Sequence, residues 1–254
     1  MTVATRRTAL AALAAGAAAG LTTACTRRAH DNRTLVIGAS PSGVPFSYVD
    51  PATNRLTGAM VDIATMLAGH LGLACDFRVV PFAALIPSLA TARIDLIAAA
   101  MLRTPAREAL VGFSTPVYAY AGGLVVRADH AARHESLASL RGLRVGAQIG
   151  TRFVDQLREA GVADIATYQG LGDMLRDLAH ARIDAAYGDA PIERVILKVG
   201  PRWPLRPVPE FRAPSQEPVC LIGRKQSPLI ARIDAVLAGP AQAELAPILA
   251  RWGL

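Results

Sequence analysis

Cysteine is rare in this chain, with three residues among 254, and this scarcity excludes a small domain stapled by disulfide bonds. After the N-terminal segment, no apolar run in the chain approaches the roughly 20 residues that span a bilayer. We therefore do not expect a polytopic membrane protein. A basic stripe with interleaved aromatic residues is also missing, because the 27 basic residues are scattered along the chain. Nucleic-acid binding is therefore not predicted.

The chain does contain a large share of apolar residues. Hydrophobic residues make up 52% and charged residues 19%, a balance that excludes intrinsic disorder and supplies enough material for one large or two smaller domains. The net charge of +7 comes mainly from arginine, and we interpret it as an arginine-rich surface.

The N-terminal residues 1–25 have the pattern of an export signal rather than of a folded element. The basic pair Arg6-Arg7 precedes an apolar stretch over 9–21, and small residues follow. The pair resembles a twin-arginine signal. We expect this segment to be removed on export and residues 26–33 to form a polar tether.

Cys25 ends the export signal. The sequence Thr23-Ala24-Cys25 resembles a bacterial lipobox, in which the cysteine becomes acylated and N-terminal; plain cleavage is the alternative. Export would place the protein in an oxidising compartment. There the other two cysteines, Cys75 and Cys220, either form one disulfide or stay as two buried thiols.

Strand and helix patterns alternate from residue 34 onward, which predicts an α/β fold with parallel strands. Two of these patterns occur twice. LVIGA at 35–39 returns as LRVGA at 143–147, and a helix end that runs into a strand at 89–95 returns at 178–184. Two copies of one unit predict two similar lobes. The expected early elements are strands at 35–39, 75–80 and 94–100, a hairpin over 47–58, and helices over 60–71, 83–92 and from 104.

Strand-like runs at 122–127 and 218–224 separate the two copies, and we expect them to be the crossings between the lobes. The first lobe would then comprise residues 34–121 and 219–254, and the second lobe residues 122–218. Ligands of open α/β sheets bind beyond the carboxyl ends of the strands. Two facing lobes therefore predict a cleft with the crossing strands at its back.

A series of short motifs runs through the chain in a fixed order: Val44-Pro45-Phe46, Phe82 through Leu89, Ile94 through Arg107, Phe113 through Tyr118, Val145-Gly146 with Gly150-Thr151, Arg182 through Ala186 with Asp189, and Ile248 through Leu254. Taken together they resemble the bacterial extracellular solute-binding proteins of family 3, the polar-amino-acid receptors of ABC importers. The resemblance implies a two-lobed α/β fold, the type II periplasmic-binding-protein fold, which closes like a venus flytrap about two hinge strands.

Under this resemblance, Arg107 grips the α-carboxylate of the ligand and Asp189 takes its α-ammonium. The chemistry suits both residues, since a guanidinium offers a charged planar fork to a carboxylate and a carboxylate at the end of a buried strand can meet a cation. Without the resemblance, Arg107 would be a surface arginine on an amphipathic turn and Asp189 a helix-entry residue.

Three further residues belong to the implied pocket. Gly150 and Thr151 open a helix whose N–H groups and dipole favour an anion, and Thr151 can also cap that helix. Phe82 either forms the aromatic floor beneath the side chain of the ligand or is ordinary core.

Several positions depart from the family pattern and leave the identity of the ligand open. Gly43 stands where an aromatic residue usually walls the pocket. Ala100 and Leu102 occupy a segment that normally supplies small and hydroxylated residues to the ligand; Ala100 keeps its backbone groups, but Leu102 offers no hydroxyl. Arg152 adds a second cation, which either favours an acidic ligand or points to solvent.

The resemblance implies a receptor without catalytic residues that captures a small polar ligand, an amino acid, and delivers it to an ABC permease driven by an ATPase. We expect a monomer in the periplasm, anchored to the membrane through lipid on Cys25. No cofactor or metal site is expected, because the five histidines are scattered, and we interpret His130 and His134 as part of a solvated face.

Two alternatives remain open at this point. A periplasmic dehydratase on the same fold would need a general acid shortly after Thr151, where Asp155 is the first carboxylate. A receptor for an organic anion other than an amino acid would use Arg107 together with Arg152.

Overall fold

The computed structural model describes residues 34–254. The export signal with Arg6-Arg7, the acylation candidate Cys25 and the tether at 26–33 lie outside the described residues, and what was predicted for them stays a prediction. Within the described range, no helix is both long and apolar enough to cross a membrane.

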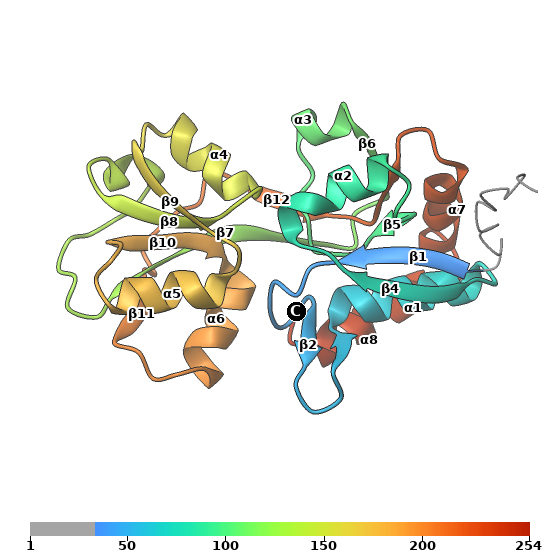
Figure 1. Cartoon of the computed structure of the whole chain (residues 1–254), viewed down its shortest axis with the longest axis horizontal. Helices are drawn as coiled ribbons and strands as arrows, with labels where there is room; N and C mark the ends of the chain where they lie inside the picture. The colour runs from blue at the N-terminus through green and yellow to red at the C-terminus, as the bar shows by residue number, and fades with distance from the viewer. Residues whose placement is uncertain (1–33) are drawn as a thin grey trace, which may run out of the picture. The chain divides into compact units, whose positions relative to one another are not determined.

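Two mixed sheets, a separate two-stranded hairpin and the helices packed around them make up residues 34–254 (Figure 1). In the first sheet the strand order is β4-β1-β5-β13-β6. Strand β1 runs parallel to β4 and β5, whereas β13 runs antiparallel to β5 and β6, so this sheet is not purely parallel. Its strands are β1 (Thr34–Ala39), β4 (Ala74–Val79), β5 (Leu96–Ile97), β6 (Val111–Phe113) and β13 (Ile222–Arg224).

Helix α1 contacts both C-terminal helices, α7 and α8, beside the first sheet. Helices α3 and α7 each begin with a capping hydroxyl, from Thr104 and Ser227 respectively, followed by a proline in the first turn, and the start of α3 at Thr104 is as predicted. The elements around this sheet are the hairpin β2 (Tyr48–Asp50) and β3 (Arg55–Thr57), α1 (Ala59–His70), a 3-10 turn η1 (Phe82–Ala84), α2 (Leu85–Ala90), α3 (Pro105–Glu108), α7 (Pro228–Leu237) and α8 (Gln242–Arg251).

In the second sheet the strand order is β11-β7-β10-β8-β9. Strand β8 is parallel to β9 and β10, and β7 is antiparallel to β10 and β11. Its strands are β7 (Tyr118–Arg127), β8 (Arg144–Gln148), β9 (Asp164–Tyr168), β10 (Ala185–Asp189) and β11 (Leu205–Pro207). Its helices are α4 (Arg152–Glu159), α5 (Leu171–Ala179), α6 (Ala190–Val199) and the 3-10 turn η2 (Leu137–Leu140).

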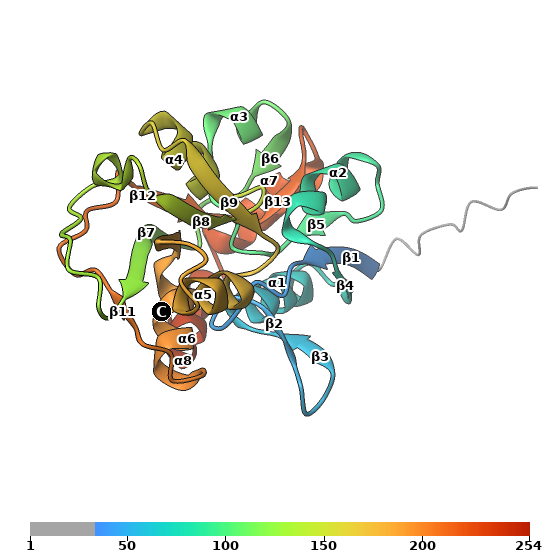
Figure 2. The same cartoon turned by 60° about the vertical axis from the view of Figure 1, so that its left-hand side comes forward.

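Two strands connect the sheets, and they pair with each other. The first four residues of β7 pair with β12 (Gln216–Val219), and the residues from Gly122 onward pair with β10 instead (Figures 1 and 2). The predicted crossing at 122–127 therefore begins four residues earlier, at Tyr118. The predicted run at 218–224 divides into β12 and β13.

The repeat read from the sequence has a physical counterpart in the two lobes. Asp95 accepts a hydrogen bond from the backbone N–H of Val36, and its counterpart Asp184 accepts one from Arg144. Before each aspartate the chain turns through an alanine with positive φ, +55° at Ala92 and +56° at Ala181. In each lobe the aspartate thus connects a helix end to a parallel strand, β1 in the first sheet and β8 in the second.

Some predicted elements are shorter in the structure. The predicted strand at 94–100 keeps ladder pairing only over Leu96–Ile97, because Ala100 takes a left-handed conformation with φ +48° that ends an extended strand. The predicted helix at 83–92 divides into η1 and α2 and stops before the positive φ of Ala92.

The two cysteines of the described chain are free, so the disulfide alternative is wrong. Cys220 is buried as expected, but Cys75 is only half-buried. Burial raises the pKa of the Cys220 thiol to about 11 and also raises that of Cys75. Both therefore stay protonated and unreactive at neutral pH.

The interpretation of His130 and His134 as a solvated face is wrong. His134 is 4% exposed, and its Nε2 lies 2.8 Å from the Nε2 of His130. The Nδ1 of His134 lies 3.2 Å from the hydroxyl of Ser139. Within residues 34–254 no three groups of the kind that bind metals lie together.

Candidate functional site

Asp189 is the last residue of β10, where the second sheet meets the crossing strand β7. The residue is only 7% exposed. Its Oδ1 accepts a short hydrogen bond from the hydroxyl of Tyr120, which lies on β7. The same hydroxyl lies 3.4 Å from the carbonyl oxygen of Ala100, in the first lobe. Tyr120 therefore connects the carboxylate of one lobe to the backbone of the other.

Burial changes the ionisation of this pair. Desolvation raises the pKa of Asp189 to about 6, while the hydrogen bond from Tyr120 and the charge of Arg107 offset part of the rise. Burial and the charge of Asp189 raise the pKa of Tyr120 well above its ordinary value, so the phenol remains a neutral donor.

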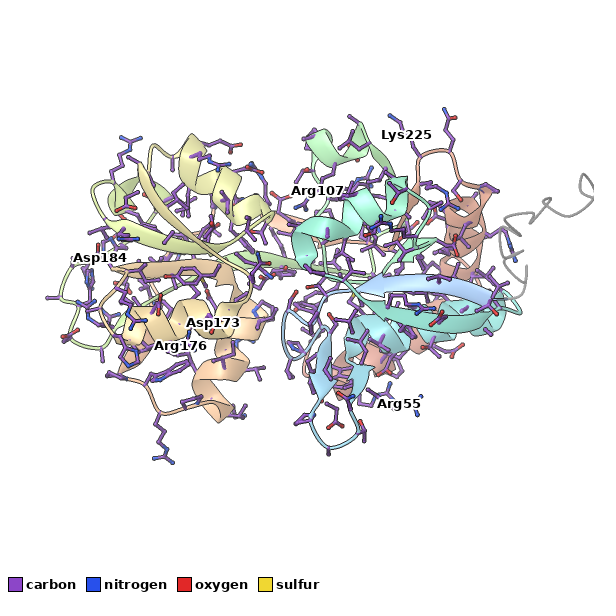
Figure 3. All side chains as sticks on the ribbon, in the orientation of Figure 1. Arg55, Arg107, Asp173, Arg176, Asp184 and Lys225 are labelled. Carbon is purple, nitrogen blue, oxygen red and sulfur yellow. The ribbon has the colours of Figure 1, made fainter. Side chains whose placement is uncertain are left out.

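Arg107 lies on α3, and Thr104 positions this short helix by accepting a hydrogen bond from the backbone N–H of Arg107 at 3.3 Å. The guanidinium donates one hydrogen bond to the carbonyl of Leu102 and another to the carbonyl of Gly150, the latter at 2.9 Å. Because Leu102 and Gly150 belong to different lobes, Arg107 reaches across the junction between them (Figure 3).

The two predicted charges thus face the same junction from opposite lobes. No ion pair joins Arg107 to Asp189 in the described structure, but each influences the ionisation of the other. Burial lowers the pKa of Arg107 from its ordinary value, and the negative charges of Asp155 and Asp189 oppose this shift. Two of the five guanidinium donors bind backbone carbonyls, which leaves donors for a further acceptor.

Ala100 and Leu102 contribute backbone groups to the junction. Both are buried, and their carbonyls face Tyr120 and Arg107 respectively. The positive φ of Ala100 costs about 1 kcal/mol relative to glycine, which gives a physical reason for small residues at this position. Leu102 also forms an isolated antiparallel bridge with Val219 of β12, so it fixes the segment to a crossing strand.

Gly150 and Thr151 begin α4 as predicted, but the side chain of Thr151 does not cap the helix. Its hydroxyl instead donates to the carbonyl of Gln148 at 2.6 Å, so the predicted cap is wrong. Gly150 has φ +77° and packs against Ala83 of the first lobe so closely that a methyl group at Gly150 would meet it at 2.9 Å. Phe82, next to Ala83, is buried in a small apolar cluster of the first lobe. Its role as the floor of a pocket stays a prediction.

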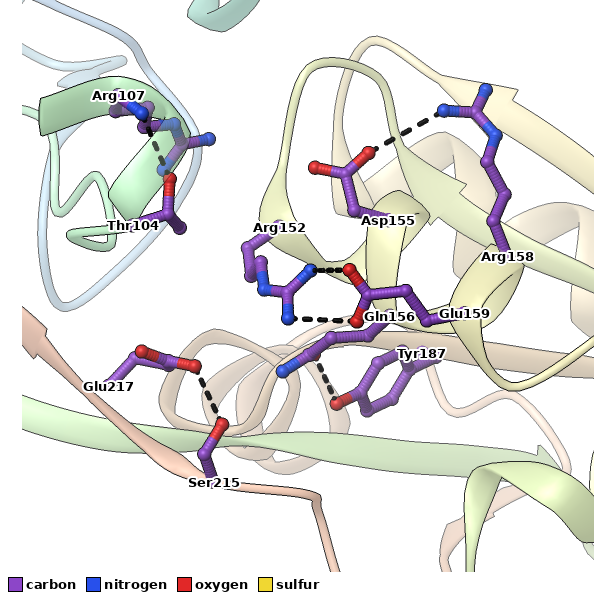
Figure 4. Close-up of polar contacts among 10 residues, drawn as sticks. All are labelled: Thr104, Arg107, Arg152, Asp155, Gln156, Arg158, Glu159, Tyr187, Ser215 and Glu217. Carbon is purple, nitrogen blue, oxygen red and sulfur yellow. Dashed lines mark hydrogen bonds and ion pairs between the residues drawn. The ribbon is translucent and has the colours of Figure 1, made fainter. Parts of the chain in front are cut away.

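Arg152 does not point freely to solvent. Its guanidinium binds both carboxylate oxygens of Glu159 on the same helix, at 2.6 and 2.9 Å (Figure 4). Hydrogen bonding by Glu159 raises the pKa of Arg152, and the pKa of Glu159 falls in return. The second predicted cation is therefore already paired within α4.

Sequence reasoning missed two residues of the junction. Tyr120 follows Tyr118 by two residues on β7, so the two side chains lie on the same face of the strand. This spacing is a signal that could have placed Tyr120 beside Asp189. Ile192, on α6, is buried so close to Gly43 that a methyl group at Gly43 would overlap it. Ile192 of the second lobe therefore takes the space beside Gly43.

Two α/β lobes joined by two strands, with opposite charges at their junction, define a two-lobed ligand-binding protein. The profile of bacterial extracellular solute-binding proteins, family 3, matches residues 35–254, and the chain belongs to this family.

Three comparisons with known proteins support this membership. The chain is 35% identical to the histidine-binding periplasmic protein of Salmonella typhimurium over 156 residues, which are 60% of this chain and 59% of that protein. It is 30% identical to ABC transporter arginine-binding protein 1 of Escherichia coli over 169 residues, 65% of this chain and 67% of that protein. A solved ancestral arginine-binding protein bound to arginine matches with a TM-score of 0.80 and 27% identity, over 88% of this chain and 99% of that chain.

The raised pKa of Asp189 predicts that this carboxylate destabilises the ligand-free fold. Since the folded state holds the proton more tightly than the unfolded state, ionisation of Asp189 opposes folding above pH about 6. Asp189→Asn should therefore raise the free energy of unfolding at neutral pH, by an amount of the order of 3 kcal/mol. This gain in the free energy of unfolding of Asp189→Asn should shrink as the pH falls through about 6 toward 3.8, the ordinary pKa of an aspartate side chain.

Denaturant titrations of both proteins across this pH range measure the difference. A difference that is the same at acidic and neutral pH would mean that ionisation of Asp189 carries no cost in the folded state.

Proposed function

We propose that this protein captures a small zwitterion, an amino acid, between its two lobes and delivers it to an ABC importer. The observation that carries the proposal is the pair of opposite charges, Arg107 and Asp189, which approach the same junction from different lobes without an ion pair between them. An α-amino acid has the complementary charges, a carboxylate for Arg107 and an ammonium for Asp189.

The names of the relatives agree with this ligand class. One is a histidine-binding protein, another is an arginine-binding protein, and the solved ancestral protein was bound to arginine. From these names we propose that the ligand is an amino acid. The names do not specify which side chain it carries. Since Glu159 already binds Arg152, a dicarboxylate held by Arg107 and Arg152 would first have to displace that carboxylate.

The proposed role is binding without catalysis. The dehydratase alternative needs a general acid at the junction, within hydrogen-bonding distance of the leaving group. Asp155, the first carboxylate after Thr151, is exposed and lies 3.5 Å from Arg158 on the same helix. The Asp155 carboxylate is thus exposed to solvent and paired with Arg158, and it is not held as a buried donor at the junction.

The proposed lobes follow the sheets. Residues 34–121 and 219–254 would form the first lobe and residues 122–218 the second, with β7 and β12 as hinge strands. Closure of such lobes on a ligand would give the importer a shape to recognise. The proposed partners are a permease and its ATPase, and the proposed state is a monomer on the outer side of the cytoplasmic membrane, in the periplasm.

The clamp predicts a sharp loss of affinity when either charge is removed. Arg107→Ala and Asp189→Ala should each weaken binding at least tenfold, a cost of roughly 2–5 kcal/mol, because the remaining charge of the ligand is buried without its partner. Arg107→Lys should recover little, because an ammonium lacks the bidentate fork. A thermal-shift screen first identifies the amino acid that raises the melting temperature of the protein most. Calorimetry with this amino acid then measures the affinity of each variant.

Arg55→Ala and Asp173→Ala are matched controls, because both side chains are exposed and lie away from the junction (Figure 3). Their affinities should equal that of the unchanged protein. Unchanged affinity in Asp189→Ala would mean that the ligand carries no ammonium at this position, and unchanged affinity in both clamp variants would remove the amino-acid clamp.

We also propose that the chain is exported and acylated at Cys25, because small residues and an apolar run precede this cysteine. Mass spectrometry of the membrane fraction should find a lipid-modified N-terminal Cys25. An N-terminus elsewhere with an unmodified Cys25 would contradict the acylation.

Replacement of Arg6-Arg7 by two lysines should hold folded precursor in the cytoplasm if export uses the twin-arginine route.

A further inference from the structure

A cavity of about 590 Å³ lies between strand β7, helix α6 and the segment that follows β11. It is separate from the Arg107–Asp189 clamp, since neither of these residues lines it. On β7 it begins at Gly122, the residue at which this strand stops pairing with β12 and starts pairing with β10. The cavity therefore lies in the second lobe, beside the crossing between the lobes.

Glu193 of α6 lines this cavity, although the residue is only 3% exposed. Its Oε1 is buried and has no hydrogen-bond partner within residues 34–254. The carboxyl group lies over Gly123 of β7 and Gly188 of β10, two glycines that pair with each other on neighbouring antiparallel strands. A side chain at Gly123 would overlap Glu193 Oε2, so the glycine leaves the space in which the carboxyl group lies.

An unpartnered buried carboxyl group is costly, and its cost calls for an explanation. Burial and the nearby charge of Asp189 raise the pKa of Glu193 well above its ordinary value. The other oxygen, Oε2, lies over Gly123, which lines the cavity. A cationic donor placed against the carboxylate at Oε2 would favour its ionised form. An ammonium group is such a donor.

The remaining walls of the cavity are apolar and its rim is basic. Leu197 on α6, with Val208 and Phe211 after β11, supplies apolar surface. Arg194 and Lys198, which are exposed, lie one turn apart on the same face of α6. The cavity thus presents a buried acceptor, an apolar middle and a positively charged rim.

We propose that this cavity binds a small organic zwitterion whose ammonium group reaches Glu193 and whose acidic group lies at Arg194 and Lys198, on either side of an apolar body. The α-ammonium and α-carboxylate of an amino acid do not fit this description, because these two charges share one carbon atom and cannot reach both the buried carboxyl group and the rim. The site is distinct from the amino-acid clamp and stands whether or not the clamp binds an amino acid.

Calorimetry of the full chain with three matched probes tests the proposal. Para-(aminomethyl)benzoate carries both charges on a rigid apolar ring, benzylamine carries only the ammonium, and benzoate carries only the carboxylate. The zwitterion should bind most tightly and benzylamine next. Benzoate should bind at least tenfold more weakly than the zwitterion, because it leaves Glu193 without a donor.

Variants locate the bound probe. Glu193→Gln should weaken binding of the zwitterion and of benzylamine at least tenfold, whereas Glu135→Gln, the same change at an exposed carboxylate outside the cavity, should change neither. Lys198→Ala should weaken the zwitterion by about twofold and leave benzylamine unchanged, since an exposed charge pair contributes little. If Glu193→Gln does not fold, Leu197→Trp, which fills the cavity, should abolish binding of the zwitterion.

Three results would overturn the proposal. They are the absence of saturable binding of para-(aminomethyl)benzoate at millimolar concentration, benzoate binding as tightly as the zwitterion, and full affinity in Glu193→Gln or Leu197→Trp. Arg107→Ala separates the two sites, because it should leave binding of this probe unchanged. A loss of probe binding in Arg107→Ala with full affinity in Glu193→Gln would place the probe in the clamp and contradict the cavity site.

Discussion

The structure depends on one constraint, the placement of a buried carboxylate, Asp189, and a half-buried guanidinium, Arg107, on two lobes where they do not neutralise each other directly. Asp189 is held by the neutral hydroxyl of Tyr120, and Arg107 is held by the backbone carbonyls of Leu102 and Gly150. Neutral partners satisfy the hydrogen bonds of these groups but leave most of their charge uncompensated. A zwitterion that enters between them would supply both missing charges, which links the stability of the closed arrangement to occupancy of the site.

The rest of the junction serves to hold these groups in place. Thr104 caps the short helix that carries Arg107, and Ala100 accepts a strained backbone so that its carbonyl reaches Tyr120. Gly150 packs directly on Ala83 from the opposite lobe, where any side chain would collide. These features cost stability when they are considered alone, and such costs are typical of sites in which function depends on a fixed geometry.

Much of the fold could be predicted from the sequence because its signals are local. The cap at Thr104, the glycine at Gly150 and the repeated turns that end in Asp95 and Asp184 follow from residues close together in the chain. These turns return with matching backbone conformations at Ala92 and Ala181. The repeat therefore predicted two lobes from short-range chemistry.

Features that depend on a choice between competing hydrogen-bond partners, or on how the two lobes meet, could not be predicted in this way. The sequence places Arg152 at the start of α4 but does not reveal that Glu159, two turns later, turns back to bind it. The hydroxyl of Thr151 was expected to cap α4, yet the carbonyl of Gln148 competes successfully for it. The approach of Ile192 to Gly43 depends on how the lobes meet, and no local pattern specifies that.

The most direct measurement is a crystal structure of the protein with the amino acid that binds most tightly. The ligand should lie between the lobes, with its carboxylate on the Arg107 guanidinium and its ammonium on Asp189. The Arg107 guanidinium should donate to the ligand carboxylate through the donors that do not bind the carbonyls of Leu102 and Gly150. A ligand bound elsewhere, with Arg107 bonded to these two carbonyls alone and Asp189 contacted by Tyr120 alone, would contradict a clamp built from these two charges.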